Sequence, residues 1–256
     1  MYDWPELRAE TDALWAALAP RIAAAGMDPP EALNRDRSAA EIWSDPALLF
    51  AQTCGLPYVA GAARATRLIC TPVYEVEGCG AGRYASALVA RPGPVPDQVR
   101  FAANGPDSLS GWAAPLAHLG EAAIAEIIWT GAHRASIAAV LEGRADLAAI
   151  DGVAWSFAKR FDPGAFALQV VGWTDPLPAL PFVTSAARPS GERARLRAAL
   201  VETLADAETA PLREALGLAR IVAFADTDYD PVRETARRAA AQLARRPDLQ
   251  AAVAAA

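Results

Sequence analysis

Asn104-Gly105-Pro106-Asp107-Ser108-Leu109-Ser110-Gly111 joins a strand-like apolar run, residues 99–103, to a helical run that begins at Trp112. Small hydroxylated residues at such a corner cap a helix, because their oxygens accept hydrogen bonds from its first free amides. The remaining amides and the positive end of the helix dipole attract a phosphate-like group. The stretch is therefore either an ordinary helix cap or an anion cradle. Pro115 cannot complete the usual backbone bond, so we expect a tight, slightly distorted first turn.

A second corner of the same form lies downstream. An apolar strand is expected over residues 125–129, and it is followed by Thr130-Gly131-Ala132-His133-Arg134-Ala135-Ser136 and a helix. Two such corners that face each other can close on one anion. His133, near the helix start, can donate to that anion, although a lone histidine in a corner is also a common structural donor to a neighbouring carbonyl.

A third candidate position is Asp151, which ends a short buried strand over residues 147–150. Open α/β sheets place ligand contacts at strand ends, so an acid there is a candidate partner for a cationic group of a ligand. Capping of the following helix is the alternative role for Asp151.

Composition sets limits on the class of protein. With 256 residues, 53% apolar and 21% charged, the chain is globular, and two lobes of about a hundred residues each are plausible. The net charge of −6 and pI near 5.1 argue against a general role in binding nucleic acid or an anionic membrane, because no basic surplus exists to displace counterions.

The cysteines and histidines argue against a metal site. Cys54, Cys70 and Cys79 lack the close paired spacing of a zinc site, and only His118 and His133 could supply imidazole. We therefore expect no metal. We also expect no cofactor and no catalytic residue, as for a binding protein. Whether Cys54 and Cys79 form a disulfide stays open.

The beginning of the sequence bears on location. The first six residues include acids where a signal peptide needs a basic end and an apolar core, and no apolar run reaches membrane-spanning length. The location expected from this start is the cytoplasm.

Other elements are expected from periodicity and turn residues. The Pro-rich segment 91–96 marks a boundary, and the Ala-rich end after Asp248 is expected to fray. The expected helices span residues 5–25, 193–207 and 231–243, and the expected strands span residues 66–72, 85–90 and 168–173.

Seven short motifs occur in an order that resembles the phosphate/phosphonate-type (PhnD-like) substrate-binding proteins of ABC transporters. They are Gln52-Thr53-Cys54-Gly55-Leu56-Pro57-Tyr58, Thr71-Pro72-Val73-Tyr74, Gly78-Cys79 with Tyr84-Ala85-Ser86, Ser108-Leu109-Ser110-Gly111, Thr130-Gly131-Ala132-His133, residues 146–151, and Leu180-Pro181-Phe182-Val183-Thr184. The resemblance implies an α/β protein of the type II periplasmic-binding-protein-like fold, with two α/β lobes joined by two crossing strands and a ligand cleft between them. We expect residues 1–84 with 183–256 in one lobe and residues 85–182 in the other.

The resemblance also implies the binding residues. Ser108, Ser110 and Gly111 would hold a phosphonate or similar oxyanion, with Thr130 and His133 opposite. The other implied residues are Tyr58 and Tyr84, which would line the cleft, and Asp151, which would meet an amino or hydroxyl group.

The chain departs from the family pattern at three places. Leu109 stands where relatives usually have a hydroxyl or amide side chain, and Ala132 stands where they have serine. Two donors are thereby absent, which favours an oxyanion that needs fewer hydrogen bonds, or a different ligand. Relatives also have an apolar strand before the segment matching Met1-Tyr2-Asp3, so a clipped start would make the protein periplasmic.

The function expected is that of a non-catalytic solute-binding protein for a small anionic ligand, with an ABC transporter permease as a partner, no nucleic acid, and a monomeric or weakly dimeric state. One alternative is a hydrolase-like enzyme on the same scaffold, with Ser108 or Ser110 as nucleophile, His133 as base and Asp151 as its orienter. The nucleophile-elbow pattern Gly-x-Ser-x-Gly is absent from the sequence. A second alternative, a ligand-sensing effector domain, lacks a helix-turn-helix segment.

Overall fold

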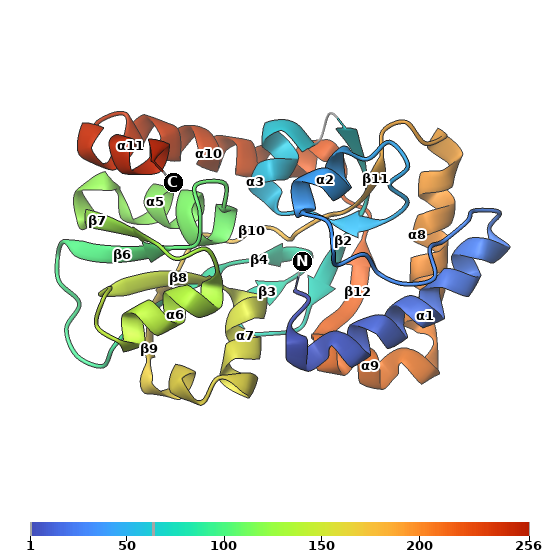
Figure 1. Cartoon of the computed structure of the whole chain (residues 1–256), viewed down its shortest axis with the longest axis horizontal. Helices are drawn as coiled ribbons and strands as arrows, with labels where there is room; N and C mark the ends of the chain where they lie inside the picture. The colour runs from blue at the N-terminus through green and yellow to red at the C-terminus, as the bar shows by residue number, and fades with distance from the viewer. Residues whose placement is uncertain (1, 63–64, 256) are drawn as a thin grey trace. The chain divides into compact units, whose positions relative to one another are not determined.

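The computed structural model describes residues 2–62 and 65–255, and the chain divides into two compact units (Figure 1). Unit 1 comprises Met1–Glu75, Gly80–Gly82 and Pro178–Asp228, and unit 2 comprises Val76–Cys79, Arg83–Leu177 and Tyr229–Ala256. The expected lobes differ from these units mainly at residues 229–256, which group with unit 2. The reason is that helix α10 (Asp230–Leu243) packs against α5 (Ala114–Leu119), so the end of the chain shares the core of unit 2.

Unit 2 is built on a five-stranded sheet of order β7-β6-β8-β5-β9. Its strands are β5 (Ser86–Ala90), β6 (Val99–Ala103), β7 (Ile124–Trp129), β8 (Leu147–Asp151) and β9 (Gln169–Trp173). Every residue of β5 and β8 is buried, as expected for strands near the middle of a sheet that is covered on both faces.

The topology of unit 2 sends its helices to both faces of the sheet. Strand β6 pairs in parallel with β7 on one side and with β8 on the other. Right-handed connections therefore place α5, between β6 and β7, on one face and α6 (His133–Leu141), between β7 and β8, on the opposite face, as Figure 1 shows. Helix α7 (Gly152–Phe161) follows β8.

Unit 1 is built on a four-stranded sheet of order β1-β11-β2-β12. The strands are β1 (Ala51–Gln52), β2 (Thr66–Tyr74), β11 (Phe182–Ser185) and β12 (Leu218–Val222). Helices α1 (Arg8–Ala24), α8 (Ser190–Ala205) and α9 (Ala210–Leu216) pack together beside this sheet, where Ile22, Ile69 and Leu196 are fully buried. A shorter helix, α3 (Gly55–Pro57), follows β1 and is continued by the wide turn η2 (Tyr58–Ala62).

Three short strands form a further sheet of order β10-β4-β3. These strands are β3 (Cys79–Gly80), β4 (Arg83–Tyr84) and β10 (Leu177–Pro178). The remaining 3-10 turns are η1 (Pro5–Leu7), η4 (Glu121–Ala123), η5 (Pro163–Ala167), η6 (Ala207–Thr209) and η7 (Asp226–Tyr229).

The prediction that the end of the chain is frayed is wrong. Residues Pro247–Ala254 form helix α11, which packs against β7. The indole Nε1 of Trp129 donates a hydrogen bond of 3.0 Å to the carbonyl of Ala252, and Arg246 donates to the carbonyls of Glu121 and Ile124. These contacts tether a segment whose alanine-rich composition alone predicts fraying.

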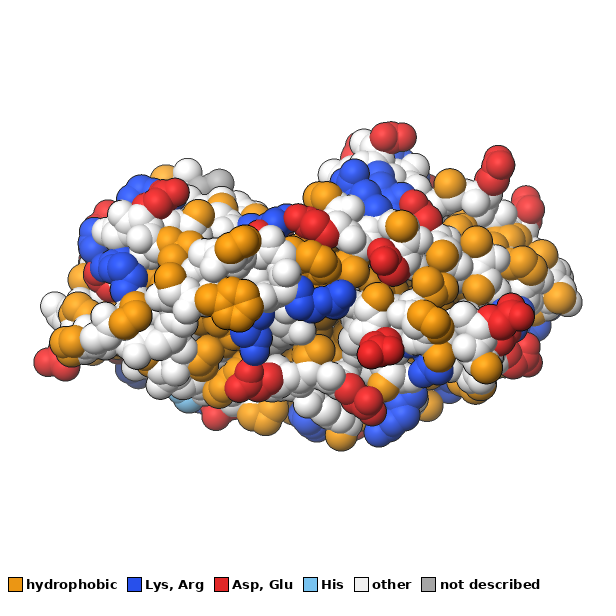
Figure 2. Space-filling view, turned by 90° about the horizontal axis from the view of Figure 1, so that it is seen from below, with side chains coloured by type: hydrophobic (Ala, Val, Ile, Leu, Met, Phe, Trp, Pro, Cys, Tyr) orange, Lys and Arg blue, Asp and Glu red, His pale blue; other side chains and the backbone are white. Residues whose placement is uncertain are grey.

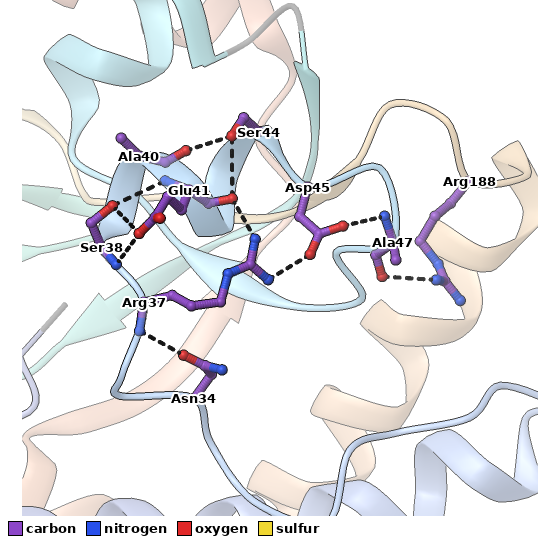
Figure 3. Close-up of polar contacts among 9 residues, drawn as sticks. All are labelled: Asn34, Arg37, Ser38, Ala40, Glu41, Ser44, Asp45, Ala47 and Arg188. Atoms are coloured by element: carbon purple, nitrogen blue, oxygen red, sulfur yellow. Dashed lines mark hydrogen bonds and ion pairs between the residues drawn. The ribbon is translucent and has the colours of Figure 1, made fainter.

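Before β1, unit 1 contains a short polar segment around α2 (Ala39–Ser44). Ser38 and Glu41 form a reciprocal capping box, and Arg37 makes an ion pair of 2.6 Å with Asp45 (Figure 3). The hydroxyl of Ser44 donates to the carbonyl of Ala40. These contacts fix the path of the chain where apolar burial is low.

Acidic and basic side chains are scattered singly and in small groups over the face shown in Figure 2. Among the described residues, no helix combines the length and apolarity needed to cross a membrane.

Candidate functional site

The carboxyl ends of β6, β7 and β8 meet at one edge of the unit 2 sheet, because these strands run in the same direction. Each strand is followed by a corner and the start of a helix. We call this region the carboxyl edge, and it consists of residues 104–111 after β6, residues 130–133 after β7 and Asp151 at the end of β8. Ligand contacts in open α/β sheets gather at such edges.

The first corner is capped by its own serine. The Oγ atom of Ser108 accepts a hydrogen bond of 3.0 Å from the backbone N–H of Gly111. That bond uses a lone pair of the hydroxyl and leaves the Ser108 proton as a donor. The same serine is therefore both a helix cap and a candidate anion contact, the two roles that the sequence left open.

The turn that follows is wider than expected. Residues Leu109–Ala113 form the π-helical turn η3, in which the N–H of Ala113 bonds to the carbonyl of Ser108 at 3.0 Å. The expectation of a tight turn is wrong, because Pro115 has no N–H to return to the carbonyl of Gly111 and so does not hold the chain to the narrower α-helical pattern. Single π-turns are frequent at functional sites.

Two corners meet at Ser110 and His133. The Oγ atom of Ser110 lies 3.0 Å from Nε2 of His133, although 23 positions separate the two residues in the chain. The backbone carbonyl of Ser110 also accepts a hydrogen bond of 3.0 Å from the hydroxyl of Ser86, at the start of β5. Ser110 is therefore held through both its side chain and its main chain.

Burial governs the charge of His133. Its Nδ1 atom is buried without a hydrogen-bond partner of good geometry among the described residues, although the residue as a whole is only partly buried. Burial lowers the pKa of His133 from 6.5 to about 4, and the carbonyl of Ala149 opposes that shift. The imidazole is therefore neutral near pH 7, and it acts as a neutral donor or acceptor.

The second corner is stabilised from within. The hydroxyl of Thr130 donates to the carbonyl of Ala103 at 3.1 Å and lies 2.6 Å from the hydroxyl of Ser136. Gly131 has a φ of +83°, a left-handed value that favours glycine. Ala132 occupies the N-cap position of α6 and gives no side-chain cap, so the departure from serine leaves the first amides of α6 without a side-chain acceptor.

Asp151 caps the third helix. Its Oδ1 accepts hydrogen bonds from the N–H groups of Val153 and Ala154, at 2.8 and 3.2 Å, and the side chain is 2% exposed. The capping role that the sequence left as an alternative is therefore present. A direct contact with a ligand stays a prediction.

The tyrosines lie in different units. Tyr84 is buried on β4 in unit 2. Tyr58 is buried in unit 1, where its hydroxyl donates a hydrogen bond of 2.8 Å to Asp226. The structure thus brings six of the eight expected residues to the carboxyl edge, namely Ser108, Ser110, Gly111, Thr130, His133 and Asp151, and the roles of the two tyrosines stay predictions.

The cysteines are free, which answers the question of pairing that the sequence left open. Burial raises the pKa of Cys70 to about 12, and it raises the pKa of Cys79 as well, with the charge of Asp151 adding to the rise. Within the described ranges, no three His, Cys, Asp or Glu side chains are grouped closely enough to hold a metal ion.

Sequence reasoning missed two polar residues at this edge. Ser86 holds the main chain of Ser110, and its own N–H donates to Oγ1 of Thr174 at 2.9 Å. Asn104 lies against Gly111, so closely that a Cβ at Gly111 would overlap its amide. Ser86 is the first residue of a strand, residues 86–90, that is otherwise apolar. A hydroxyl residue in that position is the signal that could have identified it.

Comparison with known families gives a match over most of the chain. The family described as "ABC transporter, phosphonate, periplasmic substrate-binding protein" matches residues 48–229, a range that contains every residue of the carboxyl edge. No curated protein sequence matches the chain.

Solved structures resemble the chain over nearly its whole length. A protein from Xanthomonas citri bound to chloride ion has a TM-score of 0.71 at 15% identity, over 96% of each chain. PhnD1 from Prochlorococcus marinus in complex with methylphosphonate has a TM-score of 0.68 at 14% identity, over 90% of this chain and 93% of that chain. A phosphonate-transporter binding protein from Pseudomonas aeruginosa has a TM-score of 0.65 at 17% identity, over 87% and 80%. The expected α/β fold of the type II periplasmic-binding-protein class is confirmed.

Proposed function

Because the chain belongs to the family of periplasmic substrate-binding proteins of phosphonate ABC transporters, we propose that it captures a small phosphonate- or phosphate-like oxyanion at the carboxyl edge of unit 2. The relative with bound methylphosphonate supports this ligand class. The ligand-loaded protein would then deliver the anion to an ABC transporter permease.

The contact between Ser110 and His133 is the observation that supports this proposal most directly. It joins the corners after β6 and β7, and these two corners precede the helical turns of η3 and α6. The first amides of a helix lack partners within the helix, and they point toward the space in front of it. Two helix starts linked by their side chains therefore supply amide and hydroxyl donors to one small anion.

The donors at this edge are neutral. The Ser108 and Ser110 hydroxyls, the main-chain amides and the uncharged imidazole of His133 carry no net charge. Neutral donors that are already in place bind an oxyanion through hydrogen bonds and the helix dipole, without the desolvation that a buried cation requires. We infer that the site selects its ligand by the positions of these donors.

Asp151 adds a negative group to the same edge. Its buried carboxylate repels a second anionic group, and it attracts an amine or hydroxyl on the organic part of a ligand. This charge favours a ligand with its oxyanion at the first two corners and a donor group near the third.

The enzyme alternative has one feature in its favour, the hydrogen-bonding distance between Ser110 and His133. The rest of the arrangement opposes it. Oδ1 of Asp151 accepts from two amides of α7, and the lowered pKa of His133 makes the ring a weak base at neutral pH. We therefore propose a binding role without turnover.

The family supports a proposal on location, and it does not bear on the state of assembly. The family is described as periplasmic, so we propose that the chain works there. A monomeric or weakly dimeric state stays a prediction. Cell fractionation and sedimentation of the expressed protein test the two statements separately.

Calorimetry at pH 7 tests the proposed function. The panel contains methylphosphonate, 2-aminoethylphosphonate, phosphate, a sulfonate and a carboxylate. We expect heat of binding from at least one phosphonate or from phosphate, and no hydrolysis of an activated ester by the same sample. The absence of heat with all five compounds would overturn the proposal. Ester turnover that disappears in Ser110→Ala would establish the enzyme instead.

A further inference from the structure

Asn104 is the first residue after β6, and its side chain packs directly on Gly111. A Cβ at Gly111 would overlap Oδ1 of Asn104 and approach the carbon of its amide. Because glycine has no Cβ, the Asn104 amide can occupy the space beside residue 111. The pair links the end of β6 to the turn that carries Ser110.

The two ends of the Asn104 amide have different surroundings. Oδ1 is fully enclosed and has no hydrogen-bond partner among the described residues. It faces the Cα of Gly111, where a weak C–H···O contact is the available interaction. Nδ2 is not enclosed in this way, and Asn104 as a whole residue is only partly buried. The open end of the amide is thus the end that donates.

The position of this donor matches the site. Asn104 and Ser110 belong to the same corner, and Gly111, which packs on Asn104, donates its own N–H to Ser108. An amide N–H on a residue that packs against Gly111, in the corner that carries both serines, adds a neutral donor of the kind that the other groups of this edge already provide. It also compensates in part for Leu109, whose fully buried side chain supplies no donor.

We propose that Asn104 is a ligand-binding residue that donates through Nδ2 to the oxyanion, with Gly111 as the residue that positions its amide. This inference rests on the proposed function, since it concerns the same anion. It assigns a ligand contact to a residue that begins the first corner and that was not among the binding residues expected from the sequence.

The test uses the full chain, methylphosphonate and phosphate as probes, and calorimetry at pH 7. Asn104→Ala removes the donor, and we expect a loss of affinity of about ten-fold, the size of one hydrogen bond to a charged group. Asn104→Asp replaces the donor with a carboxylate of nearly equal shape. We expect Asn104→Asp to weaken binding more than Asn104→Ala does, because its carboxylate repels the anion. Salt screens this repulsion, so the extra loss of affinity should grow as the salt concentration falls.

The matched control is Asn34→Asp, which adds the same charge at an exposed position in unit 1. We expect its affinity to stay within two-fold of the wild type, because salt at about 0.15 M screens an exposed charge. Thermal unfolding of all variants separates a loss of binding from a loss of folding.

Gly111→Ala provides an independent check on the geometry. The new methyl group displaces the Asn104 amide, so this variant should lose affinity even with Asn104 intact. In the Asn104→Ala background the overlap with the Asn104 amide is gone, and we expect Gly111→Ala to cost less affinity there than in the wild type. Additive effects of the two substitutions would contradict the positioning role.

The outcomes separate this inference from the proposed function. A wild-type protein that binds neither probe overturns both. A wild-type protein that binds a probe, together with Asn104→Ala and Asn104→Asp variants of unchanged affinity and intact folding, overturns the inference alone. The inference is supported if Asn104→Asp loses more affinity than Asn104→Ala and the Asn34→Asp control keeps the affinity of the wild type.

Discussion

Oγ of Ser110 and Nε2 of His133 lie 3.0 Å apart, and they come from the corners that follow two adjacent parallel strands. Parallel pairing of β6 with β7 produces this contact, because it brings the ends of both strands to the same edge. The contact also makes the two corners one structural unit, so a change in either residue should affect the other.

The first prediction concerns Ser110. Ser110→Ala removes the hydroxyl that lies between the two corners, and we expect the affinity for methylphosphonate to fall about ten-fold. Ser44→Ala is the matched control, since its hydroxyl bonds to helix carbonyls of α2 in unit 1 (Figure 3). Calorimetry measures both. Equal affinities of Ser110→Ala and wild type would remove Ser110 from the site.

The second prediction concerns the pH dependence of stability. The pKa of His133 is about 4 in the folded chain, below the ordinary value of 6.5. Between these values the unfolded chain binds more protons, so the stability contributed by the neutral ring is present above pH 6.5 and is lost as the pH falls toward 4. In denaturant unfolding, the free energy of unfolding of the wild type should fall from pH 7 to pH 5 relative to that of His133→Gln. A difference that stays constant over that range would contradict the lowered pKa.

The third prediction separates the two roles of Asp151. Asparagine is as good an N-cap as aspartate, so Asp151→Asn should keep most of the stability, whereas Asp151→Ala should lose about 1 kcal/mol through the missing cap. If the carboxylate also meets a ligand amine, Asp151→Asn should weaken 2-aminoethylphosphonate more than methylphosphonate. Calorimetry with both compounds decides this. Equal effects on the two ligands would leave Asp151 with the capping role alone.

The fourth prediction concerns the end of the chain. Trp129→Phe keeps an aromatic ring beside Trp112 but removes the N–H that holds the carbonyl of Ala252. We expect faster amide hydrogen exchange in α11 and little change in β7. Trp43→Phe, which removes a hydrogen bond to the carbonyl of Gln52 in unit 1, is the control. Unchanged exchange in α11 would show that other contacts hold it.

Local patterns predicted most of the elements at this edge. The apolar runs before the corners correspond to β6 (Val99–Ala103) and β7 (Ile124–Trp129), and the expected strand 147–150 corresponds to β8 with one further residue. These strands are short, rich in apolar residues and followed by glycine or small polar residues, so composition alone marks them.

Long-range packing explains what the sequence did not predict. Helix α11 depends on an indole more than a hundred positions away, and the grouping of residues 229–256 with unit 2 depends on contacts between α10 and α5. The two corners were expected to face each other, whereas the contact of Asn104 with Gly111 lies at a π-turn that the sequence did not predict. Contacts of this kind are fixed by the assembled core and leave no local pattern.

A crystal structure of the chain with methylphosphonate would test the central claim most directly. We predict that the phosphonate oxygens lie within hydrogen-bonding distance of the Ser110 hydroxyl and of a main-chain amide at the start of η3 or α6. A bound phosphonate that contacts neither corner, while Ser110 and His133 keep their contact with each other, would contradict the account.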